Sequence, residues 1–458
     1  MNRLCRTMFK RLFFQTISFA LGVALLAFPA PVFAGGEREI TLDEAYRSAL
    51  EYNERISASR YRVQQAREDV RIARSPMLPQ VRLEGRHIRL KESDPAAGFG
   101  DLAEDFGLDP DAFDFRGPDN YNEASISASQ VLFQGGKLRA GYLATQYAAE
   151  SSEFEDYRLR QQVLFSVSGS FYNVLFAGRS MEIAENRLTR STRHLDLARE
   201  RYEVGLVDIT AMLRAQVQVA AAMEAVEQAK NDYTIAKERL ALEMGVAEPP
   251  ATVKEPEPIE VPEAPVERHI EYAFDNRRDL MASQKGRRLA EKQIDAERAD
   301  FYPSLSLQGS YTVVDDEAVY GEDKYNWQAA LIASYPLFSG FRDTAEVAKA
   351  RAMESEMKAS ENRIKQEIRV DVRSAYADIQ SRKKVVEHIN DQVRAAKANY
   401  EQVSAKFEEG LASTVDVVDA ETALNEAELS LASVYYRLQL DNLGLKLATG
   451  EFLGDYLR

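Results

Sequence analysis

The chain repeats itself, and this duplication restricts the fold to two similar halves. The segment Leu132-Phe133-Gln134-Gly135 recurs 205 residues later as Leu337-Phe338-Ser339-Gly340, and Tyr202-Glu203-Val204-Gly205-Leu206 recurs at the same shift as Phe407-Glu408-Glu409-Gly410-Leu411. Toward the N-terminus the shift becomes 224 residues, because Pro79 pairs with Pro303. The first copy therefore carries a longer loop between Pro79 and Leu132. A duplication of this size is typical of one architecture built from two equivalent units.

The N-terminal segment, residues 1–34, predicts a signal peptide. Four basic residues near its start precede a mostly apolar stretch from Leu12 to Phe28, and Val32-Phe33-Ala34 supplies small residues suited to cleavage after Ala34. An uncleaved anchor helix is the alternative interpretation. The shortness of the apolar stretch and the small-residue site favour cleavage, and hence export of the protein.

Composition argues against several classes of partner. The formal net charge of −15 argues against nucleic acid as a partner. The single cysteine, Cys5, lies in the signal segment, so no disulfide is expected in the exported chain. Beyond that segment no apolar run reaches the roughly 18 residues of a transmembrane helix. Any segment that enters a membrane is therefore expected to be a strand.

The histidines and carboxylates do not form a recognisable chemical site. His87, His194, His269 and His388 are scattered, without Cys or carboxylate residues at metal-ligand spacing. No phosphate-binding loop or nucleophile elbow occurs either. We therefore expect no enzyme activity, no metal site and no cofactor. His194 and His388 are expected on solvated helix faces.

Each copy predicts a very long helix with a coiled-coil seam. Residues 341–409 contain no Gly or Pro, and a continuous helix of that length would be about 100 Å long. In its last part the seam positions recur with a mean spacing of 3.5 residues, which is typical of left-handed helix-on-helix packing. These positions are Val386, Ile389, Val393, Ala396, Tyr400, Val403 and Phe407, with the counterparts Met181, Ala184, Leu188, Ser191, Leu195, Ala198 and Tyr202.

Each long helix is expected to turn back on itself. It ends at a glycine, Gly205 or Gly410, and an N-cap candidate, Asp208 or Ser413, follows within three residues. Glycine-free segments then cover about residues 209–244 and 414–443. A long helix, a short glycine turn and another long helix predict one antiparallel helical hairpin in each copy.

Alternating segments predict one hairpin of strands in each copy. Residues 304–314 alternate between apolar and small polar side chains, and the returning strand carries Trp327 and Tyr335 on its apolar side. In the first copy residues 124–132, with Leu132 on the apolar side, pair with the weaker pattern of residues 80–90. Strands of about ten residues with one apolar face suit a membrane barrel. A soluble sheet whose apolar side covers the helices is the alternative.

Four strands cannot close a barrel alone, since about eight is the smallest usual number. The chain must therefore oligomerise, or its strands must pack elsewhere. The acidic segment 91–120 and the short segment 315–324 are expected to be exposed hairpin tips. The predicted organisation is a signal peptide 1–34, a first repeat 35–247 (strands about 80–133, helical hairpin about 137–245), a Pro-rich linker 248–266, a second repeat 267–450 (strands about 304–338, helical hairpin about 341–449) and a tail 451–458.

With these features the chain resembles the TolC-like outer-membrane efflux proteins, or outer-membrane factors, over nearly all of its length after residue 34. The resemblance is carried by the two repeats with their Leu132–Gly135 and Leu337–Gly340 motifs, by residues 202–210 and by residues 410–420. It implies a mostly helical homotrimer in the outer membrane of a Gram-negative bacterium. Each chain would give four strands to a twelve-stranded membrane β-barrel, and the coiled-coil hairpins would continue it as a helical barrel through the periplasm.

The resemblance also implies a function. These proteins are passive exit ducts for drugs, small toxic molecules or proteins of type I secretion, coupled to an inner-membrane transporter through a periplasmic adaptor. The alternative from another class is a periplasmic coiled-coil scaffold or adaptor without a pore, which would not need the alternating strands. The cargo stays open, because transporter and adaptor select it.

Site residues at the helical turns follow from the same resemblance. The adaptor-contacting tip of the family matches Val204, Gly205, Leu206, Thr210, Gly410 and Leu411. Both glycines also have the simpler role of reversing the chain. Outer-membrane lipid is the expected environment of the aromatic side chains Trp327 and Tyr335 in the barrel.

A pair of carboxylates matches those that line the family's periplasmic entrance. Asp416 and Asp419 are spaced i, i+3, so they share one helix face. Three copies would form an acidic ring, which attracts cations and disfavours anions. Asp416 also fits a capping box with Ser413, which is its alternative role.

Beside these carboxylates the sequence departs from the family. There, a closed entrance is held by an aspartate after the threonine of the first turn, together with a tyrosine and an arginine on the second hairpin. Those positions hold Ala211, Phe407 and Ala412 here, although Thr210 is retained. We therefore do not expect this entrance to close through the same contacts.

Overall fold

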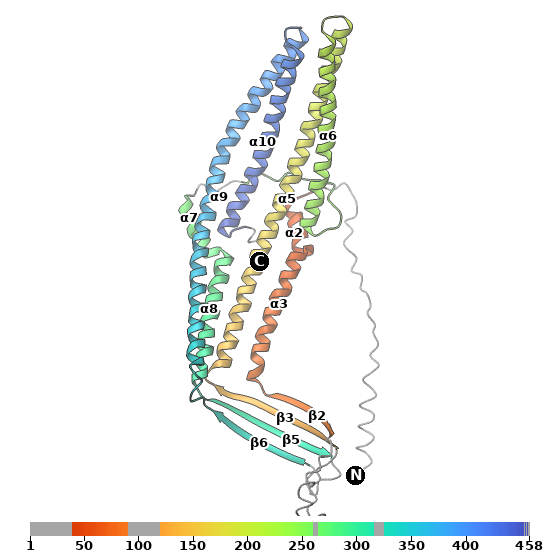
Figure 1. Cartoon of the computed structure of the whole chain (residues 1–458). Helices are drawn as coiled ribbons and strands as arrows, with labels where there is room; N and C mark the ends of the chain where they lie inside the picture. The colour runs from red at the N-terminus through yellow and green to blue at the C-terminus, as the bar shows by residue number, and fades with distance from the viewer. Residues whose placement is uncertain are drawn as a thin grey trace, which may run out of the picture.

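The computed structural model describes residues 39–89, 120–259, 264–315, 325–452, 454 and 456. These form a long, narrow molecule with a tilted sheet at one end and two helical tips at the other (Figure 1). The predicted signal peptide and most of both predicted strand-hairpin tips lie outside the described residues.

The helices of the two halves match in length. The short helices α2 (Leu42–Tyr52) and α7 (Val266–Asn276) have 11 residues each, and α3 (Glu54–Arg74) and α8 (Arg278–Arg298) have 21 each. Two 3-10 turns, η1 (Ser75–Met77) and η4 (Ala299–Phe301), lead from α3 and α8 into the sheet.

The long helices match as well. Both α5 (Lys137–Glu203) and α9 (Arg342–Glu408) run for 67 residues, and both α6 (Ile209–Met244) and α10 (Thr414–Thr449) run for 36. All seven predicted seam positions of α9 are buried or half-buried, from Val386 to Phe407. The predicted long helices and their antiparallel hairpins are therefore present in both halves.

Short helices lie end to end beside each long one (Figure 1). Gly245 ends α6 with a φ of 75°, and a Cβ there would lie 2.5 Å from the backbone of Tyr52. In the second half Gly450 ends α10 with a φ of 79°, and its Cβ would lie 3.0 Å from the backbone of Asn276. Thus α6 abuts the α2–α3 junction and α10 abuts the α7–α8 junction.

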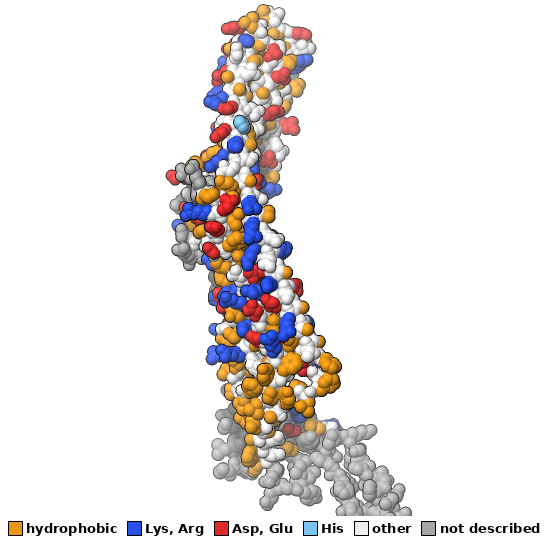
Figure 2. Space-filling model, turned by 90° about the vertical axis from the view of Figure 1, so that its left-hand side faces the viewer, with side chains coloured by type: hydrophobic (Ala, Val, Ile, Leu, Met, Phe, Trp, Pro, Cys, Tyr) orange, Lys and Arg blue, Asp and Glu red, His pale blue; other side chains and the backbone are white. Residues whose placement is uncertain are grey.

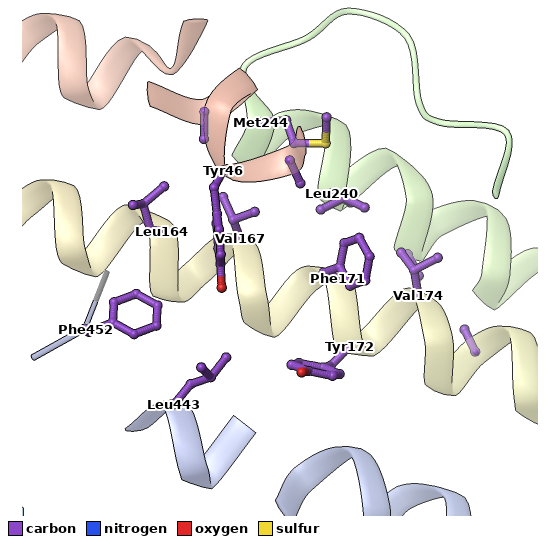
Figure 3. Close-up of a cluster of buried hydrophobic side chains, with 14 residues drawn as sticks. Tyr46, Leu164, Val167, Phe171, Tyr172, Val174, Leu240, Met244, Leu443 and Phe452 are labelled. Atoms are coloured by element: carbon purple, nitrogen blue, oxygen red, sulfur yellow. The ribbon is translucent and has the colours of Figure 1, made fainter. Parts of the chain in front are cut away.

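The two apolar cores lie where these junctions meet the long helices. The first contains Val167, Val174 and Leu240, and the second contains their counterparts Val372, Ile379 and Leu445, each 205 residues later. Figure 3 shows side chains of α5 directed toward α2 and α6, with Leu443 and Phe452 on the opposite side of α5. Full burial of each such large apolar side chain contributes about 1.5–3 kcal/mol.

Four strands form one antiparallel sheet in the order β2-β3-β5-β6. Their bounds are β2 Gln80–Arg89, β3 Asn120–Gln134, β5 Ser304–Asp315 and β6 Tyr325–Ser334. The β3–β5 pair joins the two halves, whereas β2 and β6 each have one partner strand within the described ranges. A separate two-stranded parallel pair joins β1 (Glu39–Ile40) to β4 (Thr252–Val253).

A β-bulge in β3 corrects one detail of the predicted alternation. The pairing register with β5 shifts between Val131 and Phe133. Phe133, and not Leu132, therefore lies opposite Leu305 on the apolar face. A bulge inserts one residue and reverses the alternation that follows, which a strict period of two cannot anticipate.

Candidate functional site

The two helical tips end in the same turn. Gly205 and Gly410 adopt φ angles of 77° and 83°, in the left-handed region that glycine tolerates. The amide of Leu206 donates to the carbonyl of Arg201 at 2.8 Å, and that of Leu411 donates to Lys406 at 2.8 Å. These bonds are typical of a Schellman cap, which satisfies the last carbonyls of a helix.

The caps leave the apolar side chains of both turns in solvent. Val204, Leu206 and Leu411 are all more than 70% exposed. An open groove of about 460 Å³ lies just behind the turns, between α6 and α10. Its walls include the half-exposed side chains of Leu213 and Val415. Each tip therefore presents an apolar surface that the single chain does not cover.

The two carboxylates predicted to line the entrance, Asp416 and Asp419, differ in their local roles. Asp416 accepts hydrogen bonds from the backbone amide of Ser413 at 2.8 Å and from its hydroxyl at 2.7 Å, which completes the capping box at the start of α10. These bonds lower the pKa of Asp416, so its carboxylate is charged at neutral pH. Asp419 is exposed one turn later. Asp208 makes no such cap in α6; instead Thr210 Oγ1 donates to its carboxylate at 3.2 Å.

A buried carboxylate joins the two hairpins near the tips. Glu421 of α10 is only 4% exposed, and it accepts a hydrogen bond from the Ser191 hydroxyl of α5 at 3.0 Å. Arg190 Nε lies 3.6 Å from the same carboxylate. Burial raises the pKa of Glu421, whereas Ser191 and Arg190 oppose that rise. The sequence offered a weak signal for this contact, since Ser191 is the polar member of the predicted seam.

The prediction that His194 lies on a solvated helix face is wrong. His194 is 8% exposed and packs on the ring of Phe407 with centroids 4.4 Å apart, so it does not lie on a solvated face. Arg201 covers the same Phe407 ring at 4.8 Å, and Arg193 pairs with Glu408 at 3.0 Å. His388, by contrast, is exposed as expected. These contacts join α5 to α9 at Phe407, one of the three positions where the sequence predicts that the entrance does not close through a salt-bridge latch.

The sheet has one apolar and one polar face. Across all four strands, the paired positions Leu83, Ile126, Tyr311 and Trp327 form one apolar row. The adjacent row on the opposite face is polar: Arg82, Ser127, Ser310 and Gln328. Trp327 and Tyr335 are both exposed in the single chain. Figure 2 shows apolar side chains gathered at the sheet end of the molecule, below a more charged helical part.

Two other kinds of feature are absent from the described ranges. No group of three or more His, Cys, Asp or Glu residues is placed there to hold a metal ion. None of the helices in this part of the chain carries an apolar stretch of the length needed to span a bilayer.

Known proteins share this sequence pattern and fold. The family model described as outer membrane efflux protein matches residues 45–246 and 270–451. The chain is 26% identical over 424 residues to outer membrane protein TolC of Vibrio cholerae, covering 89% of this chain and 90% of that protein. It is 24% identical over 431 residues to TolC of Escherichia coli, covering 89% and 82%.

Solved structures give the same answer for the fold. The CmeC outer membrane channel of Campylobacter jejuni matches with a TM-score of 0.76 at 16% identity, covering 90% of this chain and 86% of that one. The outer membrane protein VceC of Vibrio cholerae matches with a TM-score of 0.73 at 19% identity, covering 89% and 96%. The predictions of a TolC-like fold and of an outer-membrane location that extends into the periplasm are confirmed. This chain belongs to the outer membrane efflux protein family.

Proposed function

We propose that three copies of this chain form a closed twelve-stranded barrel in the outer membrane, continued by a helical tunnel in the periplasm. The observation that carries the proposal is the four-stranded sheet, which has an apolar face and, among the described strands, open edges at β2 and β6. Backbone groups at an open edge have no partner in hydrocarbon, so a spanning sheet must close. Pairing β6 of one copy with β2 of the next satisfies both edges.

The trimer would act as the passive exit duct of a tripartite efflux or type I secretion system. Two of the relatives support the export role by name: the outer membrane efflux protein BepC of Brucella suis and the cation efflux system protein CusC of Escherichia coli. We propose that a periplasmic adaptor docks on the tips at Val204, Leu206 and Leu411, with Gly205, Gly410 and Thr210 shaping the turns. The exposed apolar side chains and the groove behind them support this role. An inner-membrane transporter would supply the cargo and the energy.

At the entrance, Asp416 and Asp419 would form a ring of carboxylates around the threefold axis. Both side chains are exposed on the first turns of α10, and Asp416 is charged at neutral pH. An acidic ring at a constriction favours cations over anions. The duct itself needs no catalytic residue or cofactor for this role.

Conductance measurements test the proposal. Protein purified from the outer-membrane fraction is expected to be a trimer and to form cation-selective channels in planar bilayers. Replacing both carboxylates, Asp416→Asn with Asp419→Asn, removes the charge but keeps an oxygen that can cap α10, so selectivity should fall while assembly is retained. A stable monomer in detergent-free buffer would contradict the channel. Unchanged selectivity in an assembled trimer would exclude the two carboxylates from the pore.

A further inference from the structure

One turn of the second repeat has an unusual backbone and an unusual surface. Phe341, which precedes α9, has a φ of 65° and is the one non-glycine residue with positive φ in the described ranges. The equivalent residue of the first repeat, 205 positions earlier, is Gly136 with a φ of 88°. This left-handed conformation is disfavoured for any residue with a Cβ, so the aromatic side chain is retained against a local preference.

Among the described residues, the Phe341 ring contacts Phe338 but is not buried by the rest of the fold. Phe341 is 74% exposed, and its neighbours Leu337 and Phe338 are 90% and 76% exposed. The rings of Phe338 and Phe341 pack edge to face with centroids 5.5 Å apart, so they project together as one apolar unit. We call Leu337, Phe338 and Phe341 the aromatic turn. A strained turn that exposes three bulky apolar side chains indicates an external partner.

Position along the sheet identifies that partner. Aromatic side chains occur at both ends of the sheet: Tyr311, Tyr325 and Trp327 lie on the apolar face at the far end, and the exposed Tyr302, Tyr335 and the aromatic turn flank β5 and β6 at the helix end. Between the two groups, β5 and β6 place only small or aliphatic residues on this face, such as Gly309, Ala329 and Leu331, whereas β3 places the polar Gln130 opposite Leu307. From Trp327 to Tyr335 the chain advances about 26 Å, at roughly 3.3 Å per residue. Because barrel strands tilt by about 35–45°, this path covers roughly 20 Å of height, and the aromatic turn beyond Tyr335 extends it toward the apolar band of about 25 Å that aromatic girdles flank in membrane barrels.

We propose that the aromatic turn is an interfacial anchor that inserts into the periplasmic leaflet of the outer membrane, at the level of the phospholipid headgroups. The inference rests on the proposed function, because it requires the sheet to span that membrane. It adds that anchoring is unequal between the repeats, since the first repeat has Gly136 where the second has Phe341. Arg342 follows directly; its Nε lies 3.1 Å from Asp343, but its side chain is 71% exposed and suits the phosphate level of the same leaflet.

The single tryptophan of the chain allows a direct test. The tryptophan fluorescence of the parent protein reports on Trp327 alone. That of the double variant Trp327→Phe, Phe341→Trp reports on the turn alone. Both proteins are reconstituted in phospholipid vesicles that carry bromine either near the headgroups or deep in the acyl chains. We expect bromine near the headgroups to quench the Trp at position 341 at least twofold more than deep bromine. Water-like emission without quenching would overturn the anchor. Quenching of Trp327 in the parent would then show that the sheet still enters the bilayer.

A second variant separates a lipid anchor from a contact between copies. Phe341→Gly installs the residue of the first repeat and removes the backbone strain. We expect its insertion into vesicles to fall several-fold, while the Tm of the detergent-solubilised trimer does not fall. A lower Tm in detergent together with normal insertion would assign Phe341 to the subunit interface and overturn the proposal.

Discussion

Two glycines at helix ends have the same backbone conformation but differ in how closely they are packed. Gly205 and Gly245 have nearly equal φ angles of 77° and 75°, but a Cβ at Gly205 meets nothing within 4 Å, whereas one at Gly245 lies 2.5 Å from Tyr52. Gly205→Ala should therefore destabilise by about 1–2 kcal/mol, the cost of the left-handed conformation alone. Gly245→Ala should cost distinctly more, because the α6 end must also move off the α2–α3 junction. Thermal unfolding followed by circular dichroism compares them, and equal changes in Tm would refute the packing argument.

Acidification is expected to destabilise the helical tips at His194. Burial, and then the nearby Arg201, lower the pKa of His194, so the folded tip disfavours the charged imidazole. A histidine with a lowered folded pKa contributes full stability above its ordinary pKa of about 6.5, and this contribution is lost as the pH falls below that value. Glu421 has a raised pKa, so its own protonation on acidification acts in the opposite sense.

We therefore expect the protection of amides at the α5 and α9 tips against hydrogen exchange to fall as the pH falls below about 6.5, once the intrinsic slowing of exchange in acid is corrected for. His194→Gln removes the titrating group and is the matched control, since it should abolish this loss of protection. If the variant and the parent responded alike, the contact of His194 with Phe407 would not be the pH-sensitive element.

At the scale of elements, adjacent residues of β3 report on the two faces of the sheet. Ile126 pairs with Leu83 and Tyr311 on the apolar face, whereas Ser125 pairs with Glu84 and Thr312 on the polar face. Ile126→Arg should destabilise membrane insertion by about 2–4 kcal/mol, as for a cation on the lipid face of a barrel. Ser125→Arg should be tolerated, since it faces the aqueous side beside a carboxylate. The amount of trimer in the outer-membrane fraction measures both, and equal losses would argue against a lipid-facing side.

At the scale of the whole molecule, the duplication gives each half the same helices but different end residues. Two helices of 67 residues, each about 100 Å long, connect the sheet to the tips without interruption. Three copies would thus surround the axis with six similar hairpins. Asp416 and Asp419 have the counterparts Ala211 and Arg214, and Phe341 has the counterpart Gly136. The repeats therefore share a scaffold, while the two carboxylates predicted at the entrance and Phe341 of the aromatic turn belong to the second half only.

The sequence by itself determined the duplicated architecture, the long helices, the strands and the glycine turns. Each of these has a local cause: a period of 3.5, an alternation of two, or a glycine at a positive φ. Tertiary structure alone decided which side chains meet across the hairpins. Ser191 and Glu421 are 230 residues apart in sequence, and His194 is buried only because α9 brings Phe407 against it. Periodicity assigns a residue to a face, but burial and partners depend on the neighbouring helix, which the local pattern does not contain.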